Sequence, residues 1–121
     1  GGPGDYEACQ SIAQQSNYKE IINLAGMLSL KQTAALMSDA EMNYVNDSAP
    51  LHLASAMNAP VTAIFCSTVP RFGFFPVSDN SIIIETEFDL DCRPCGLHGF
   101  NECPLGHFNC AHTIDTQKLL L

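Results

Sequence analysis

The sequence predicts an α/β fold, a layered domain built on a mainly parallel sheet. The run Val61–Phe65 is β-branched and continuously apolar, which is typical of a strand buried in a parallel sheet. Shorter strand-like runs at Met42–Val45 and Ile82–Ile84 alternate with segments whose apolar residues recur at helical spacing. Such sheets bind ligands beyond the carboxyl ends of their strands, so the loops at those ends are the places to look for a site.

The N-terminal third is expected to hold two helices and one strand. Asp5 is placed to cap a helix that runs to about Gln15, because apolar residues recur at helical spacing after it. Ile21–Leu24 is apolar and β-branched and is predicted to be a strand. Ser29 is then placed to cap a second helix over Leu30–Met37.

The middle of the chain is a point where a strand gives way to a helix. Met42–Val45 is short and mostly apolar, as a buried strand is, and Asn46–Ser48 follows it. The residues from Leu51 to Met57 fit a buried helix that Asn58 and Pro60 bring to an end. We therefore expect a helix to begin immediately beyond the carboxyl end of a parallel strand.

The remaining segments are predicted to be mostly loop. Ser67–Ser81 is rich in Pro, Gly and aromatic residues, and a Cys-rich loop at about 90–112 precedes a short C-terminal helix near Thr113. Three loops are candidates for ligand binding because each is expected at a strand end or a helix start: Gly2–Asp5, Gly26–Ser29 and Asn46–Ser48.

Composition narrows the function. A chain of 121 residues is expected to form one domain with a real core. Its net charge of −8 argues against nucleic acid as a partner and against binding flat on an anionic membrane. No run approaches the roughly 20 apolar residues of a membrane span. The chain opens on a glycine-rich turn without a signal peptide, so we expect a fragment of a longer cytoplasmic protein.

The stretch Asn46–His52 predicts an anion site. Asp47 or Ser48 can cap the helix, and Pro50 lacks a donor where the first turn needs none. A helix start carries unpaired backbone N–H groups and partial positive charge, which together favour a bound phosphate. His52 lies about one turn beyond Ser48, so its ring can face the same anion. The alternative is that these residues only cap and pack.

The same stretch resembles a known family. Asn-Asp-Ser-Ala-Pro-Leu-His, followed by Leu-Ala-Ser-Ala-Met-Asn-Ala-Pro-Val and a strand ending at Phe65, is similar to the C-terminal half of family 9 glycosyltransferases. These are the lipopolysaccharide heptosyltransferases, whose signature reads roughly Asn-Asp-Ser/Thr-Gly-x-x-His-Leu-Ala. The resemblance runs from Gly1 to about Ile114. Ala49 stands where the family usually has glycine, which slightly hinders the approach of backbone to phosphate.

The resemblance implies roles for the residues of the helix start. Asp47, Ser48 and Ala49 would lie in the loop that holds the diphosphate of a sugar nucleotide, and His52 would contact a phosphate oxygen. For Asp47, capping the helix, binding a sugar hydroxyl and holding a metal ion all stay open.

Two N-terminal loops are also given roles by the resemblance. Asp5 would accept hydrogen bonds from the nucleotide ribose, with a plain helix cap as the alternative. Met27 and Leu28 would form the adenine pocket, with plain core residues as the alternative.

The implied activity belongs to a larger enzyme. The chain would be the nucleotide-sugar-binding, Rossmann-like half (residues 1–121) of a two-domain GT-B glycosyltransferase that transfers heptose from ADP-heptose to the lipopolysaccharide inner core. It would act at the cytoplasmic face of the inner membrane, with no cofactor required. The acceptor site and the catalytic carboxylate would lie in an absent N-terminal half. We therefore expect no catalytic residue here and no activity from the fragment alone.

The cysteines leave a second class of function open. Cys92, Cys95, Cys103 and Cys110 have spacings that suggest zinc, although the second pair is wider than a usual zinc knuckle. We rank a reduced structural loop first, metal second and disulfides third. The alternatives to a glycosyltransferase are a small zinc-binding module and a doubly wound interaction domain that binds no nucleotide.

Overall fold

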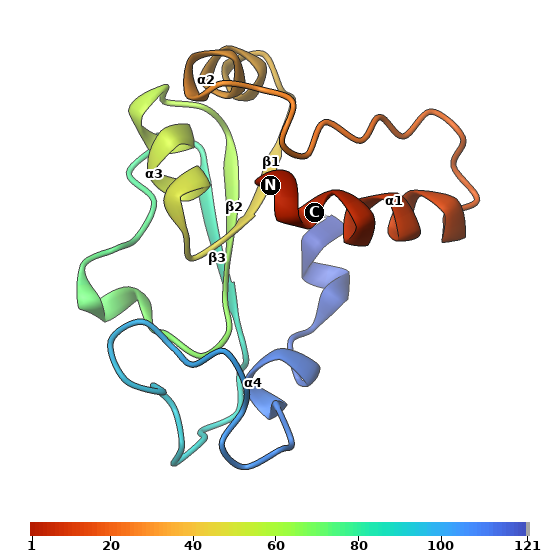
Figure 1. The fold of residues 1–121 in the computed structure, drawn as a ribbon. Coiled ribbons are helices and arrows are strands. Elements are labelled where there is room, and N and C mark those ends of the chain that lie inside the picture. The colour runs from red at the N-terminus through yellow and green to blue at the C-terminus, as the bar shows by residue number, and fades with distance from the viewer. Residues whose placement is uncertain (121) are drawn as a thin grey trace. The chain divides into compact units, whose positions relative to one another are not determined.

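The computed structural model describes residues 1–120 and has the predicted α/β architecture (Figure 1). The chain divides into two compact units, Gly1–Ala35 and Leu36–Leu121. Helix α2 (Leu30–Ser38) crosses the boundary between them. No helix among residues 1–120 is both long enough and apolar enough to cross a membrane.

The first unit is built of helices and irregular chain. A 3-10 turn at Pro3–Asp5 leads into α1 (Tyr6–Gln15), whose bounds match the prediction. Helix α2 begins with a reciprocal cap, because the Ser29 N–H donates to Oε1 of Gln32 at 2.9 Å and the Gln32 N–H donates to the Ser29 hydroxyl oxygen at 3.4 Å.

The strand predicted at Ile21–Leu24 is wrong. The segment is irregular, and Ile21 and Ile22 are 42% and 78% exposed. The side chain of Asn23 instead holds the segment to α1 by donating to the carbonyl of Tyr6 at 3.0 Å. Because a strand needs a partner for its backbone, apolar β-branched composition alone did not make one here.

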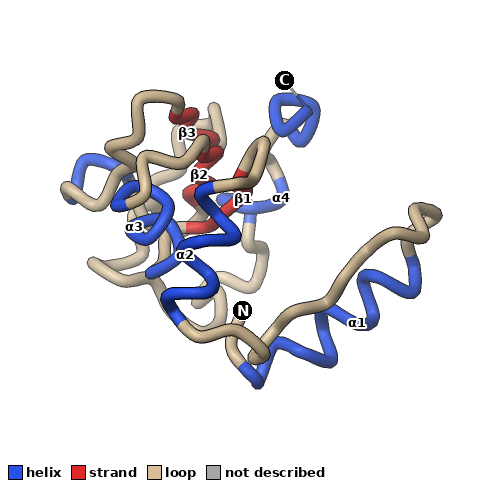
Figure 2. Tube along the Cα trace, turned by 90° about the horizontal axis from the view of Figure 1, so that it is seen from above, coloured by secondary structure: helices blue, strands red, loops and turns tan. Residues whose placement is uncertain are grey.

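The second unit contains a parallel sheet of three strands in the order β1-β2-β3. These are β1 (Asn43–Asn46), β2 (Val61–Phe65) and β3 (Ser81–Glu85). Helix α3 (Ala49–Ala56) connects β1 to β2 and lies beside the sheet (Figure 2). The alternation of strand and helix around parallel strands was predicted from the sequence and is confirmed.

The core lies between α3 and the central strand. Leu51 and Ala54 of α3 are fully buried, and they form one cluster with the buried residues of β2, Val61, Ala63 and Phe65. Every residue of β2 except half-buried Ile64 is buried, and burial on both faces of the strand explains why apolar residues occupy successive positions rather than alternate ones. The packing of α3 on β2 therefore fixes where the first turn of α3 lies relative to the sheet.

The C-terminal part of the second unit is mostly loop, as predicted. It ends in the short helix α4 (Asn109–His112) and a 3-10 turn at Thr116–Leu120. The hydroxyls of Thr86, which follows β3, and Thr113, which follows α4, are 2.6 Å apart and hydrogen bonded. This bond holds the end of the Cys-rich loop beside the end of the sheet.

Candidate functional site

The carboxyl ends of the three parallel strands lie at one edge of the sheet. The N–H of Asp47 donates to the Ile64 carbonyl at 3.2 Å, so the pairing of β1 with β2 extends one residue into the loop that starts α3. Of the three loops that the sequence marked for ligand binding, Asn46–Ser48 is the one that follows a strand of this structure. The Gly26–Ser29 loop does not follow a strand, because Ile21–Leu24 is irregular.

The start of α3 leaves backbone donors open. Ser48 is the N-cap, with extended backbone, and its hydroxyl donates to the Asn46 side-chain oxygen at 2.8 Å instead of capping the helix. Within residues 1–120 the structure shows no hydrogen bond from the N–H of Ser48 or Ala49, and Pro50 has no N–H. Two adjacent donors at the positive end of a helix are suited to an anion.

Asp47 makes a tertiary contact that the sequence did not indicate. Its carboxylate accepts a hydrogen bond of 2.6 Å from the hydroxyl of buried Thr68, which lies three residues beyond β2. Asp47 therefore does not cap α3, and it links the loops that follow two neighbouring strands. Thr68 could have been suspected only from its place just past the most apolar strand.

His52 is exposed on α3, one turn beyond Ser48. Its ring meets Phe74 edge to face, with ring centroids 6.1 Å apart and an interplanar angle of 70°. The loop that carries Phe74 is fixed beside α3 by a hydrogen bond of 3.2 Å from the Val77 N–H to the Ser55 hydroxyl oxygen. The role of Phe74 in orienting the histidine is not visible in the sequence. Convergence of Asp47, Ser48 and His52 on one anion stays a prediction.

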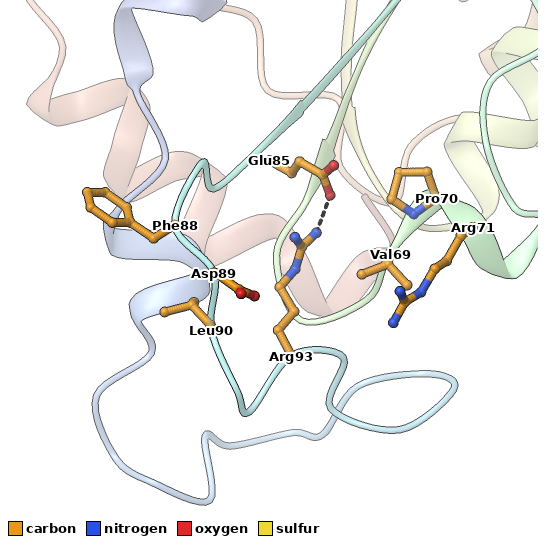
Figure 3. A pocket seen from close by; sticks show the side chains of 8 residues that line it. All are labelled: Val69, Pro70, Arg71, Glu85, Phe88, Asp89, Leu90 and Arg93. Atoms are coloured by element: carbon orange, nitrogen blue, oxygen red, sulfur yellow. Dashed lines mark hydrogen bonds and ion pairs between the residues drawn. The ribbon is translucent and has the colours of Figure 1, made fainter.

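Arg93 clamps the loop after β2 to the end of β3 (Figure 3). Its guanidinium donates to the carbonyl of Cys66 at 2.7 Å and to the carbonyl of Thr68 at 2.8 Å. It also pairs with the carboxylate of Glu85 at 2.5 Å. With its side chain only 11% exposed, Arg93 is committed to the protein and holds the ligand-side edge of the sheet in shape.

A cavity of about 450 Å³ opens at the ends of β2 and β3 (Figure 3). Its walls come from the loop that follows β2, the last residue of β3 and the segment after it. The lining residues are Val69, Pro70, Arg71, Glu85, Phe88, Asp89, Leu90 and Arg93. Because cations and carboxylates line it together, the cavity is suited to a polar, hydroxyl-rich group rather than to an apolar one.

The first unit brings its two predicted loops together. The N–H of Gly26 donates to the Gly1 carbonyl at 3.0 Å, and a Cβ built at Gly26 would lie 2.6 Å from Cα of Pro3. The loop of Met27, 61% exposed, and half-buried Leu28 therefore adjoins the turn that ends at Asp5.

The carboxylate of Asp5 already accepts an N–H bond from Gly2 at 2.7 Å, so it stabilises its own turn, and this side chain makes no cap bond to α1. The roles assigned to Asp5 in ribose binding and to Met27 and Leu28 in base binding stay predictions.

The Cys-rich loop is anchored to the loop that follows β2, at the carboxyl edge of the sheet. The N–H of Cys95 donates to the Ser67 carbonyl at 2.8 Å. All six cysteines are free thiols. Among the residues that the structure describes, no three His, Cys, Asp or Glu side chains are arranged to hold a metal ion. The zinc alternative therefore has no preformed ligand set within residues 1–120.

Comparison with known proteins gives one consistent family. The family model for glycosyltransferase family 9 (heptosyltransferase) matches residues 1–99. The chain is 27% identical over 122 residues to lipooligosaccharide heptosyltransferase 2 of Campylobacter jejuni serotype O:2, covering 98% of this chain and 36% of that protein. It is 33% identical over 78 residues to lipopolysaccharide heptosyltransferase 3 of Escherichia coli, covering 64% of this chain and 23% of that protein.

A solved structure agrees with these sequence matches. The glycosyl transferase family 9 protein from Veillonella parvula superposes with a TM-score of 0.61 and 30% sequence identity, over 69% of this chain and 23% of that one. The chain thus spans about a third of the length of the Campylobacter relative and less of the others.

Proposed function

The chain belongs to glycosyltransferase family 9, and we propose that it supplies the nucleotide-sugar-binding part of a heptosyltransferase. The proposed reaction transfers heptose from ADP-heptose to the inner core of lipopolysaccharide. The names of the Campylobacter and Escherichia relatives, a lipooligosaccharide heptosyltransferase and a lipopolysaccharide heptosyltransferase, support heptose as the sugar and a molecule of this class as the acceptor. In this proposal the complete enzyme works at the cytoplasmic face of the inner membrane, and this chain forms the C-terminal half of its GT-B architecture.

The open donors at the start of α3 carry the proposal. The N–H groups of Ser48 and Ala49 stand beyond the carboxyl end of β1 without hydrogen bonds of their own within residues 1–120. As the glycosidic bond of the donor breaks, negative charge gathers on the departing diphosphate. Donors that are fixed before the reaction stabilise that charge without reorganising, which lowers the barrier.

His52 is proposed to add a donor to the same diphosphate. Its exposed ring is free to hydrogen bond, and its edge-to-face contact with Phe74 restricts how the ring turns. A protonated imidazole would give a charge-assisted hydrogen bond to a phosphate oxygen.

The first unit is proposed to bind the nucleoside. Asp5 has a second carboxylate oxygen with which to accept a ribose hydroxyl, and the exposed apolar side chain of Met27 next to Leu28 offers a surface for the adenine ring. The group that activates the acceptor hydroxyl and the acceptor site itself are assigned to other parts of the longer enzyme. The chain's own contribution is then to bind the donor and to stabilise the leaving group. We propose that it needs no cofactor and binds no nucleic acid.

Replacing His52 by alanine tests the proposed function. In the natural protein that carries this chain, kcat/KM for ADP-heptose should fall by roughly 10- to 150-fold, because a charge-assisted hydrogen bond contributes about 1.5–3 kcal/mol. Initial rates of heptose transfer measure the effect.

His98→Ala is the matched control, since His98 is an exposed histidine of the Cys-rich loop. It should leave kcat/KM unchanged. Phe74→Ala separates packing from phosphate binding, because it removes the ring contact and keeps the imidazole. Wild-type kinetics in a well-folded His52→Ala protein would contradict the phosphate role and favour simple packing.

A further inference from the structure

Four cysteines from distant points of the Cys-rich loop line one cavity. The cavity has a volume of about 280 Å³, and its walls include Cys92, Cys95, Cys103, Cys110 and His107. All four are free thiols. Within residues 1–120 no three Cys, His, Asp or Glu side chains are placed so that they could hold a metal ion. The loop therefore gathers sulfur atoms without arranging them as a metal site, and their own chemistry is the feature to explain.

The Cys103 sulfur is held by backbone donors. The N–H of Phe108 donates to Sγ of Cys103 at 3.4 Å, and the Gly106 N–H donates to the Cys103 carbonyl at 3.0 Å, so the chain wraps around this residue. Backbone hydrogen bonding, from Phe108 foremost, lowers the pKa of the Cys103 thiol below its usual value. Cys103 is also partly exposed, so a small reagent in solvent can reach it.

Cys110 and Cys95 differ from Cys103 in burial or in hydrogen bonding. Cys110 is only 6% exposed, and burial raises the pKa of its thiol, with a further rise from the neighbouring charges of Cys66, Cys95 and Cys103. The Cys95 thiol donates to the carbonyl of Cys92 at 3.2 Å. The cavity thus combines Cys103, a half-buried sulfur that accepts a backbone N–H, with Cys110, a thiol buried from solvent.

We propose that this cavity is a site of reversible thiol oxidation, in which a peroxide oxidises Cys103 and Cys110 then closes a disulfide with it. An accessible, hydrogen-bonded sulfur beside a protected second thiol is the arrangement of a reactive and a resolving cysteine. Cys110 is the partner because it is the buried thiol that lines the same cavity as Cys103.

The chemistry balances in two steps. The Cys103 thiolate attacks one oxygen of hydrogen peroxide, an S–O bond forms, the O–O bond breaks, and hydroxide leaves and takes a proton from solvent. Sulfur is oxidised by two electrons and peroxide is reduced. The Cys110 thiol then attacks the sulfenyl sulfur, an S–S bond forms, the S–O bond breaks, and the proton of the thiol leaves with the hydroxyl group as water. A dithiol reductant restores both thiols.

The experiment exposes the natural, folded protein to increasing hydrogen peroxide in the presence and absence of dimedone, which traps sulfenic acid. Remaining thiols are then alkylated, and peptides are mapped by mass spectrometry. Without dimedone we expect a Cys103–Cys110 disulfide before any other modification. In Cys110→Ser, Cys103 should instead appear as its dimedone adduct.

Two further variants test whether Cys103 is the sulfur that reacts first. Cys103→Ser should slow the first modification by roughly tenfold or more, because the most nucleophilic sulfur is gone. Cys9→Ser changes a thiol of α1 outside the cavity and should react as wild type. Far-UV circular dichroism and thermal melting verify that each variant is folded.

Several results would overturn the proposal. These are equal reactivity of all six thiols, persistence of rapid modification in folded Cys103→Ser, and a disulfide from Cys103 to Cys92 or Cys95 in place of Cys110. Elemental analysis showing one zinc per chain, with the four cavity thiols protected until the metal is removed, would also overturn it in favour of a metal site.

Discussion

Phe65→Ala is expected to lower the free energy of unfolding by about 3–5 kcal/mol, the usual cost of emptying a buried aromatic site. Phe65 is the last residue of the central strand β2 and is fully buried against α3. Its removal leaves a cavity in the cluster of buried residues that joins α3 to the sheet, so the first turn of α3 should lose its fixed position. Urea denaturation followed by circular dichroism measures the change.

Phe88→Ala is the matched control for this prediction. Phe88 is 64% exposed and lies after β3, so the same change in side-chain volume creates no buried cavity. We expect its effect to stay within about 0.5 kcal/mol, as for most surface substitutions. Equal losses in the two variants would show that the packing of α3 on β2 does not dominate the stability of the second unit.

Arg93→Met is expected to cost about 2–4 kcal/mol, because it removes donors from two carbonyls and leaves the Glu85 carboxylate without its partner. We expect a smaller loss of stability than for a fully buried ion pair, because the Glu85 side chain is 39% exposed and solvent screens its charge. Donor binding should weaken as well, because the loop that positions Thr68 and Asp47 loses its clamp. Thermal unfolding and donor titration measure the two effects.

Two variants show whether the guanidinium geometry matters. Arg93→Lys keeps the positive charge but not the fork of donors, and it should recover only part of the lost stability. Arg71→Met removes an exposed arginine from the same cavity and should leave stability unchanged. Full recovery in Arg93→Lys would mean that charge, rather than the bonds to Cys66 and Thr68, holds the loop.

The parts of the fold that depend on local sequence were predictable. Val61–Phe65 is a strand residue for residue as expected, because a run of apolar residues that must be buried on both faces carries its own signal. The start of α3 was also predictable, since Pro50 and the polar residues before it mark a helix N-terminus from sequence alone. Ile21–Leu24 has similar composition but no neighbouring strand, and pairing is not a local property.

The parts of the site that depend on long-range contacts were not predictable. Asp47 was expected to cap a helix, to bind a ligand or to hold a metal, and its bond to Thr68 spans 21 residues. No local pattern indicates a structural role for Arg93, because its bonds reach residues 25 and 27 positions earlier in the chain. Such contacts depend on how the loops after adjacent strands meet, and no spacing rule along the sequence encodes that meeting.

The central claim is that the diphosphate of the donor binds at the start of α3. The most direct test is the backbone amide NMR spectrum of the natural protein, titrated with ADP and, separately, with adenosine. We expect ADP to shift the Ser48 and Ala49 amide resonances in a saturable manner. Adenosine should shift the amide resonances of the Met27–Leu28 segment and leave those of Ser48 and Ala49 unchanged. Saturable ADP binding that leaves the Ser48 and Ala49 amides unchanged would contradict the claim.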